Sequence, residues 1–316
     1  MAEHQEVPPQ PGNHHMPEEE EHLVPKFRRF VRWYKAVYPG IPIKIMEKMA
    51  FKPPVSSYTL TPNGDHAHRM VLDTDDPAIQ NLLNTTIVRW TDNDRGSHIV
   101  TAFSPRANSR HTLFVSHSGT GDLGKNLELF TLLMERTNCN VFSYDYSGYG
   151  CSTGKPSDAN IYADARAALE VLVHTHRVPE TEIVLFGQFI GTAPSIHLAM
   201  RNRNFAGLIL HAPMKSYGEI KMAPFKTFLG CDILRSADKI RQVVCSTTVI
   251  HNEQDTVVPF PHGEKIFTDC PGRRGEIARS LAPRNQLDTW DLDFIIEFIT
   301  NQTGNFADLP EVPANN

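Results

Sequence analysis

The sequence predicts an α/β fold in which a mostly parallel, twisted sheet is flanked by helices, with no large cap domain. Three observations support this prediction. A chain of 316 residues with 40% hydrophobic content can bury a large core. From about residue 86 onward, short apolar runs alternate with segments of helical spacing. One of these runs, at 183–188, leads through a turn flanked by two glycines directly into a helical segment.

The apolar runs allow the strands to be placed in order. Residues 86–90 and 98–104 flank a turn at 93–96, which predicts an antiparallel pair at the sheet edge. Five later runs predict buried strands, at 112–117, 140–146, 183–188, 207–213 and 247–254. Helical spacing predicts helices at 158–176, 192–203 and 288–300.

The two ends of the chain differ in composition from this region. Residues 1–25 contain no Lys or Arg and are rich in Pro and Glu, which predicts a disordered acidic tail. Residues 26–52 form a basic, aromatic segment. We expect the α/β domain to occupy 53–303 and a flexible C-terminal tail to follow at 304–316.

The basic segment 26–52 has two interpretations. It carries eight Lys and Arg residues against the single acidic residue Glu47, interleaved with aromatic side chains. A helix that docks its aromatic side on the domain explains the pattern, and so does a basic amphipathic surface for anionic lipid. The candidates for membrane contact are Arg28, Arg29, Arg32, Trp33 and Lys35.

Charge and cysteine content exclude other classes. A formal net charge of −5 argues against a general nucleic-acid-binding protein, which needs a basic surface. The five cysteines form no CxxC pair, so we expect reduced thiols, no metal site and no cofactor. These features indicate a protein of the cytosol, with peripheral contact at the cytosolic face of the plasma or endosomal membrane as an open alternative.

The segment "LFGQFIGTAP" has the pattern of a nucleophile elbow, the sharp strand-to-helix turn that presents a catalytic serine. Gly187 and Gly191 stand two residues on either side of Phe189, where small neighbours are needed by a strained central residue. Asp255 ends a predicted strand before a proline-bearing loop, where the acid of such triads lies. The turn "SHSGTGDLG" follows the strand at 112–117, where an oxyanion-hole turn belongs.

Four motifs carry a resemblance to a known family: "FKPPVSSYTL", "NCNVFSYDYSGYGCSTGKPSDANIYAD", "VLFGQFIGTAPSIHLA" and "VIHNEQDTVVPFPHG". Over roughly residues 43 to 300 the chain resembles alpha/beta-hydrolase-domain-containing family seventeen. The resemblance implies the alpha/beta-hydrolase fold and the activity of serine hydrolases that remove palmitate from cysteines of membrane proteins. Family members also begin with a palmitoylated cysteine cluster, whereas this chain has no cysteine before Cys139, so anchoring by that route is not expected.

The chain departs from the family at two triad positions. The family elbow reads GQSIG, so Phe189 occupies the nucleophile position, and a benzyl group cannot attack a carbonyl. Alignment without gaps places Arg284 at the general-base position, and an arginine cannot accept a proton from a nucleophile. Asp255 remains at the acid position, either as a cap of its own loop or in a salt bridge with Arg284.

The oxyanion turn also departs from the family, which reads SHGNAVDLG there. Ser118 replaces a glycine after His117, and two new glycines follow at Gly119 and Gly121. With the elbow residues Gln188 and Ile190, His117, Ser118 and Gly119 form the expected oxyanion turn. Phe189 either plugs the mouth of the acyl pocket or leaves a usable apolar cavity, and Ser118, Ser195 and Cys151 are weak candidates for a substitute nucleophile.

Three functions remain as hypotheses. The first is a catalytically inactive member, a pseudoenzyme that binds an acylated membrane protein or an active family member. The second is an active palmitoyl-protein hydrolase, as the resemblance implies. The third is a small-molecule receptor that uses the former acyl pocket, for which an open cavity of several hundred Å3 is expected.

Overall fold

The computed structural model describes residues 29, 41–64, 67–221, 232–282 and 286–302. The predicted tails at 1–25 and 304–316 lie outside the described residues, as do Arg28, Arg32, Trp33, Lys35 and Arg284. Of the membrane candidates, Arg29 alone is described, and it is exposed.

The centre of the molecule is a ten-stranded sheet with the order β1-β2-β3-β4-β6-β5-β7-β8-β9-β10. Its first four strands pair antiparallel with their neighbours, and the six strands from β6 to β10 in this order are parallel. The strands are β1 Thr59–Pro62, β2 His68–Val71, β3 Ile87–Asp92, β4 His98–Ser104, β5 Thr112–Ser116, β6 Asn140–Tyr144, β7 Ile183–Gln188, β8 Gly207–His211, β9 Thr247–Asn252 and β10 Ala278–Ser280.

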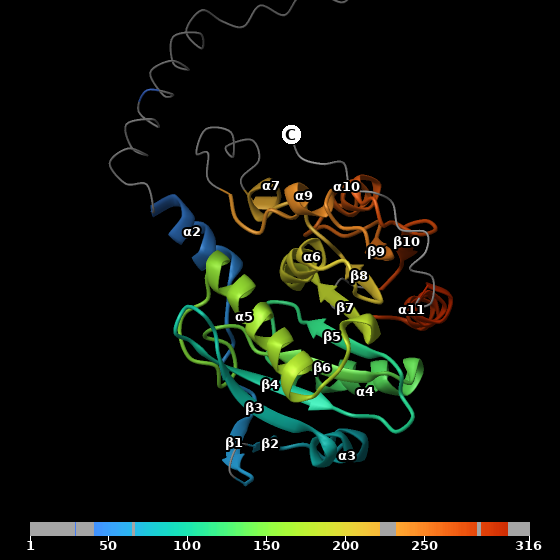
Figure 1. Cartoon of the computed structure of the whole chain (residues 1–316). Coiled ribbons are helices and arrows are strands. Elements are labelled where there is room, and N and C mark those ends of the chain that lie inside the picture. Colours follow the sequence, from blue (N-terminus) through green and yellow to red (C-terminus); the bar gives the residue numbers. More distant parts are fainter. Residues whose placement is uncertain (1–28, 30–40, 65–66, 222–231, 283–285, 303–316) are drawn as a thin grey trace, which may run out of the picture.

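Helices cover both faces of this sheet (Figure 1). They are α2 Ile41–Ala50, α3 Pro77–Thr85, α4 Leu127–Thr137, α5 Asp158–Glu170, α6 Thr192–Arg201, α7 Tyr217–Lys221, α9 Ser236–Ile240, α10 Pro261–Asp269 and α11 Thr289–Gln302. Along β5, Phe114 joins the apolar cluster beneath α5 and α6, while Leu113 and Val115 join the cluster beneath α4 and α11. Successive side chains of a strand point to opposite faces, so one strand contributes to both cores.

The structure confirms the predicted fold class. The antiparallel pair β3–β4 and the five parallel strands β5 to β9 form at the expected residues. The expectation that β3–β4 is the edge of the sheet is wrong, because β1 and β2 extend the sheet beyond β3. The sequence patterns do not predict the short strands β1, β2 and β10, nor helices α3, α4, α7, α9 and α10. Within the described ranges, no helix is long and apolar enough to cross a membrane.

Candidate functional site

The elbow has the geometry that its sequence predicts. Strand β7 ends at Gln188, a single 3-10 turn covers Phe189–Gly191, and α6 begins at Thr192. Phe189 has a φ of 52°, the left-handed region that L-residues rarely adopt. The strained backbone of a nucleophile elbow is therefore present, with a phenyl ring at its apex.

Close approach of the backbone explains the two elbow glycines. A Cβ on Gly191 would lie 2.0 Å from the carbonyl oxygen of Ser116, and one on Gly187 would lie 2.7 Å from the carbonyl oxygen of Gly191. Both neighbours are backbone atoms, which cannot move aside without shifting a strand or a helix. The turn is thus packed against the end of the adjacent strand β5, which holds residue 189 at the carboxyl edge of the sheet.

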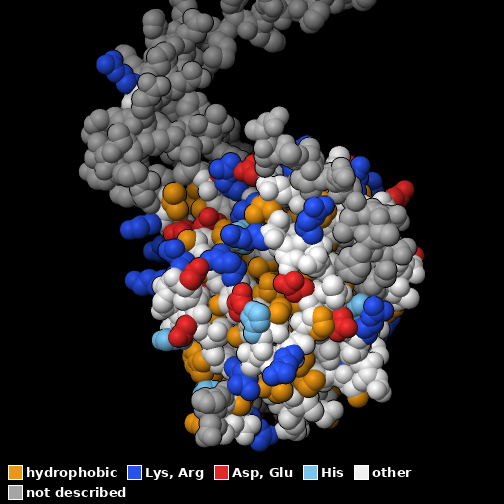
Figure 2. Space-filling view, viewed as in Figure 1, with side chains coloured by type: hydrophobic (Ala, Val, Ile, Leu, Met, Phe, Trp, Pro, Cys, Tyr) orange, Lys and Arg blue, Asp and Glu red, His pale blue; other side chains and the backbone are white. Residues whose placement is uncertain are grey.

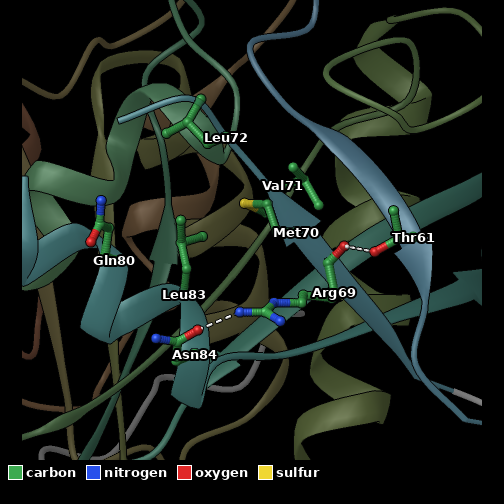
Figure 3. A pocket seen from close by; sticks show the side chains of 8 residues that line it. All are labelled: Thr61, Arg69, Met70, Val71, Leu72, Gln80, Leu83 and Asn84. Carbon is green, nitrogen blue, oxygen red and sulfur yellow. Dashed lines mark hydrogen bonds between the residues drawn. The ribbon is translucent and has the colours of Figure 1, made fainter. Parts of the chain in front are cut away.

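The side chain of Phe189 is half-buried and packs against the apolar cluster that includes α5 and α6. A cavity of about 520 Å3 lies elsewhere, between the β1–β2 hairpin and α3 (Figure 3). Met70 and Leu83 lie in its wall, with Arg69 and Asn84 hydrogen-bonded to each other beside them. None of its lining residues belongs to the elbow, so this cavity gives no support to a receptor function at the former acyl pocket.

The turn after β5 is held by a buried polar network. His117 and Asp145 are both inaccessible to solvent, and His117 Nε2 lies 3.4 Å from Asp145 Oδ1. His117 Nδ1 donates to the carbonyl oxygen of Ser118 at 2.7 Å, and the Tyr146 hydroxyl donates to the carbonyl oxygen of His117 at 2.6 Å. His117 therefore shapes the turn through hydrogen bonds to its own neighbours.

Asp145 is the centre of this network. It accepts hydrogen bonds from the Tyr58 hydroxyl at 2.5 Å and from the backbone N–H of Leu123 at 2.9 Å. Burial raises the pKa of Asp145, and the nearby imidazole of His117 and the hydrogen bond from Tyr58 oppose this shift. Burial also raises the pKa of Tyr58 far above its ordinary value, so this hydroxyl stays protonated and donates to the carboxylate.

A second buried carboxylate fixes the loop that follows β6. Asp164 accepts hydrogen bonds from the backbone and side chain of Ser147, at 2.7 and 2.8 Å, and from Asn93 Nδ2 at 2.6 Å. Burial raises its pKa to about 6. The specific "FSYDYSGYG" motif of the sequence therefore serves as the support of the oxyanion turn, a role that its spacing alone did not reveal.

Ser118 and Gly119, the oxyanion-turn residues that differ from the family pattern, fit the geometry of the turn. Ser118 is buried and its hydroxyl lies 3.0 Å from that of Thr120. Gly119 lies against the elbow, because a Cβ there would stand 2.4 Å from Cδ1 of Ile190. The Tyr149 hydroxyl donates to the carbonyl oxygen of Gly119 at 3.3 Å. The turn thus packs on Ile190, and Gln188 and Ile190 are both buried as the elbow enters α6.

Asp255 caps its own loop. Its Oδ1 accepts hydrogen bonds from the backbone N–H groups of Val257 and Val258, at 2.8 and 2.9 Å. Its Oδ2 lies 3.9 Å from Nε2 of His251, which is buried and donates to the carbonyl oxygen of Val258 at 2.8 Å. Burial lowers the pKa of His251, so the ring is held neutral.

The position of Arg284 lies outside the described residues, so its salt bridge with Asp255 stays a prediction. The chain just before it is described. Asn252 Nδ2 donates to the carbonyl oxygens of Leu281 and Ala282, at 3.1 and 2.9 Å. Strands β9 and β10 run parallel, so the chain after β9, which carries Asp255, and the chain after β10 leave the sheet at the same edge.

The candidate substitute nucleophiles are poorly prepared for attack. Ser195 is fully buried and donates to the carbonyl oxygen of Gly191 at 3.0 Å. Burial raises the pKa of the Cys151 thiol, which lowers its thiolate fraction. Across the described ranges, no group of three or more His, Cys, Asp or Glu side chains could hold a metal ion.

This geometry defines a class of protein. An elbow at the carboxyl edge of a parallel sheet, with a turn after one neighbouring strand and an acid after a later strand, is the arrangement of the alpha/beta hydrolase fold. A family model described as serine aminopeptidase S33 matches residues 107–256. The esterase Pf2001 of Pyrococcus furiosus superposes with a TM-score of 0.58 over 74% of this chain and 96% of its own, at 15% identity, which shows the fold alone.

Curated relatives identify the family within this class. The alpha/beta hydrolase domain-containing protein aho-3 of Caenorhabditis elegans is 41% identical over 74% of this chain and 70% of its own length. Protein 17C of Xenopus tropicalis is 32% identical over 84% of this chain and 93% of its own, and human protein 17B is 34% identical over 73% and 82%. The chain belongs to the alpha/beta hydrolase domain-containing protein 17 family.

Proposed function

We propose that this chain is a pseudoenzyme of its family, which binds an acylated membrane protein and does not cleave its thioester. The observation that carries the proposal is Phe189 at the apex of a well-formed elbow. The backbone holds residue 189 where a nucleophile must stand, and the side chain there has no lone pair to attack a thioester carbonyl.

The surrounding site supports binding rather than turnover. The oxyanion turn retains its buried support through His117 and Asp145, so the turn keeps its shape beside the elbow. The carboxylate of Asp255 is engaged with the backbone of its own loop. A half-buried aromatic ring at the elbow offers an apolar contact for an acyl chain.

The competing proposal is an active palmitoyl-protein hydrolase, which is what membership of a hydrolase family favours. It requires a nucleophile other than residue 189. Two candidate nucleophiles are engaged, since the Ser195 hydroxyl donates to the carbonyl oxygen of Gly191 and the Ser118 hydroxyl lies 3.0 Å from that of Thr120. We therefore rank the active hydrolase below the pseudoenzyme.

The test compares the purified chain with its Phe189→Ala variant for hydrolysis of a palmitoylated cysteine peptide and for labelling by a fluorophosphonate. We expect neither turnover nor label in either protein, together with tighter binding of the palmitoylated peptide than of the same peptide without its acyl group. Turnover that survives in both proteins would mean that another residue attacks. Equal affinity for the two peptides would remove the acyl-binding part of the proposal.

A restored triad provides the matched control. Phe189→Ser alone is expected to give almost no esterase activity, because no base is in place. Phe189→Ser combined with Arg284→His is expected to give weak activity, since the elbow backbone already has the required conformation. If the single variant were as active as the pair, residue 284 would not be the base position.

A further inference from the structure

Helix α2 presents an unusual surface to solvent. Two of its apolar side chains, Ile45 and Met49, are 53% and 41% exposed. Lys44 and Lys48 are exposed on the same helix. At 100° per residue these four positions share the outer side of α2, with the lysines on one flank and the apolar side chains on the other. We call this surface the α2 face (Lys44, Ile45, Lys48 and Met49).

The inner side of α2 binds the domain through Met46 and Glu47. Met46 is buried and lies 3.2 Å from the position of a Cβ on Gly218. Glu47 Oε1 accepts a hydrogen bond from the backbone N–H of Asp158 at 2.9 Å, at the start of α5. The only acidic residue of α2 is therefore directed inward, and the charge of the outer face is positive.

The chain just after α2 reaches the candidate site. The backbone N–H of Lys52, just after α2, donates to the Tyr149 hydroxyl at 3.1 Å, and this hydroxyl donates to Gly119 in the oxyanion turn at 3.3 Å. Two further exposed groups follow the helix, the side chain of Lys52 and that of Val55, which is 92% exposed. In Figure 2, Lys and Arg side chains project at the left edge, where Figure 1 places α2.

We propose that the α2 face docks on an anionic phospholipid bilayer and turns the candidate site toward that membrane. Single exposed apolar side chains are ordinary on a soluble protein. Here they share one helix with lysines, which is the pattern of a helix lying in the membrane interface with its apolar side chains inserted and its cations at the headgroups. Charge complementarity selects the bilayer as the occupant, since headgroups of anionic lipids attract lysines near the surface.

The membrane contact does not depend on the proposed function, because bare vesicles contain no acylated protein. The experiment measures partitioning of the full-length chain onto phosphatidylcholine vesicles with and without phosphatidylserine, at low and at high salt. We expect binding to the phosphatidylserine vesicles that weakens with salt. Lys48→Glu should lower the partition constant at least about fivefold, and Ile45→Glu about tenfold.

Matched controls come from exposed residues far from α2. Arg110→Glu, just before the amino end of β5, reverses one cation, and Val71→Glu, on strand β2, removes one exposed apolar side chain. Neither control is expected to change binding, and circular dichroism checks that all four variants are folded. The proposal is wrong if the full chain fails to bind at low salt, which would assign the α2 face to a protein partner. It is equally wrong if the two α2 variants bind as well as the two controls, which would place the contact elsewhere in the chain.

Discussion

The two halves of the candidate site are held by different means. The oxyanion turn rests on a network inside the core, where His117 and Asp145 are inaccessible to solvent. The loop of Asp255 lies at the surface, with Glu253 and Thr256 exposed, and is held mainly by hydrogen bonds to its own backbone. Substitutions in the oxyanion turn must therefore respect a support inside the core, whereas the acid loop is held by its own backbone and by the hydrogen bonds of Asn252 to the chain after β10.

The largest effect is expected where the elbow meets the oxyanion turn. Gly191→Ala places a Cβ 2.0 Å from the carbonyl oxygen of Ser116, so a strand or a helix must move. We expect a loss of at least about 4 kcal/mol in the free energy of unfolding, measured in urea. The control is Gly96→Ala, which meets no atom within 4 Å and has a φ of 80°. It should lose only about 1 kcal/mol, from backbone strain, and equal losses would contradict the packing argument.

The second largest effect is expected from removing a carboxylate, and the loss of stability can be compared directly between the two halves. Asp145→Ala leaves the Tyr58 hydroxyl and the Leu123 N–H buried without their acceptor, and should lose about 3 to 4 kcal/mol. Asp255→Ala leaves the N–H groups of the half-buried Val257 and the buried Val258 without their acceptor, and should lose about 2 kcal/mol. Chemical denaturation of both variants measures the difference. Losses of similar size would show that the halves are equally rigid.

The two halves should also respond to pH in opposite directions. Burial raises the pKa of Asp164 from 3.8 to about 6, so the native state binds more protons than the unfolded state in this interval. Its contribution to stability is present below about pH 4 and is lost as the pH rises to about 6. The stability of the wild type relative to Asp164→Asn should therefore be greater at about pH 4 than at about pH 7, by up to about 3 kcal/mol.

The stability that depends on His251 should change with pH in the opposite direction. Burial lowers its pKa below 6.5, so the unfolded state binds more protons as the pH falls. The wild type should lose stability relative to His251→Gln as the pH falls below 6.5. Unfolding at several pH values checks this sign. A difference between the two proteins that does not change with pH would mean that the ring is not held neutral.

The smallest effect tests the contact between turn and elbow. Gly119→Ala meets the end of the flexible Ile190 side chain at 2.4 Å, and should lose about 1 kcal/mol. Ile190→Val removes the Cδ1 atom that is in the way. The double variant is therefore expected to be more stable than the sum of the two single losses predicts, and simple additivity would argue against direct packing.

The sequence by itself determined the fold class, the parallel strands and the elbow. Alternating apolar runs and helical spacing are local signals, and a strand that is buried on both faces needs a continuous apolar run. Short elements carry too few residues for such a signal, which is why β1, β2 and β10 were not found. The sequence also determined the chemistry of residue 189, because a phenylalanine carries no nucleophilic atom in any fold.

Only the tertiary structure decided how the site is supported. Tyr58, His117 and Asp145 are far apart in the chain. The contact of His117 with Asp145 exists only because β5 and β6 are neighbours in the sheet, and the hydrogen bond of Tyr58 to Asp145 joins residues 87 positions apart. It likewise decided which side of α2 faces solvent, through Met46 and the hydrogen bond of Glu47 to α5. Burial and long-range contact are properties of the assembled chain, so no local pattern could have assigned these roles.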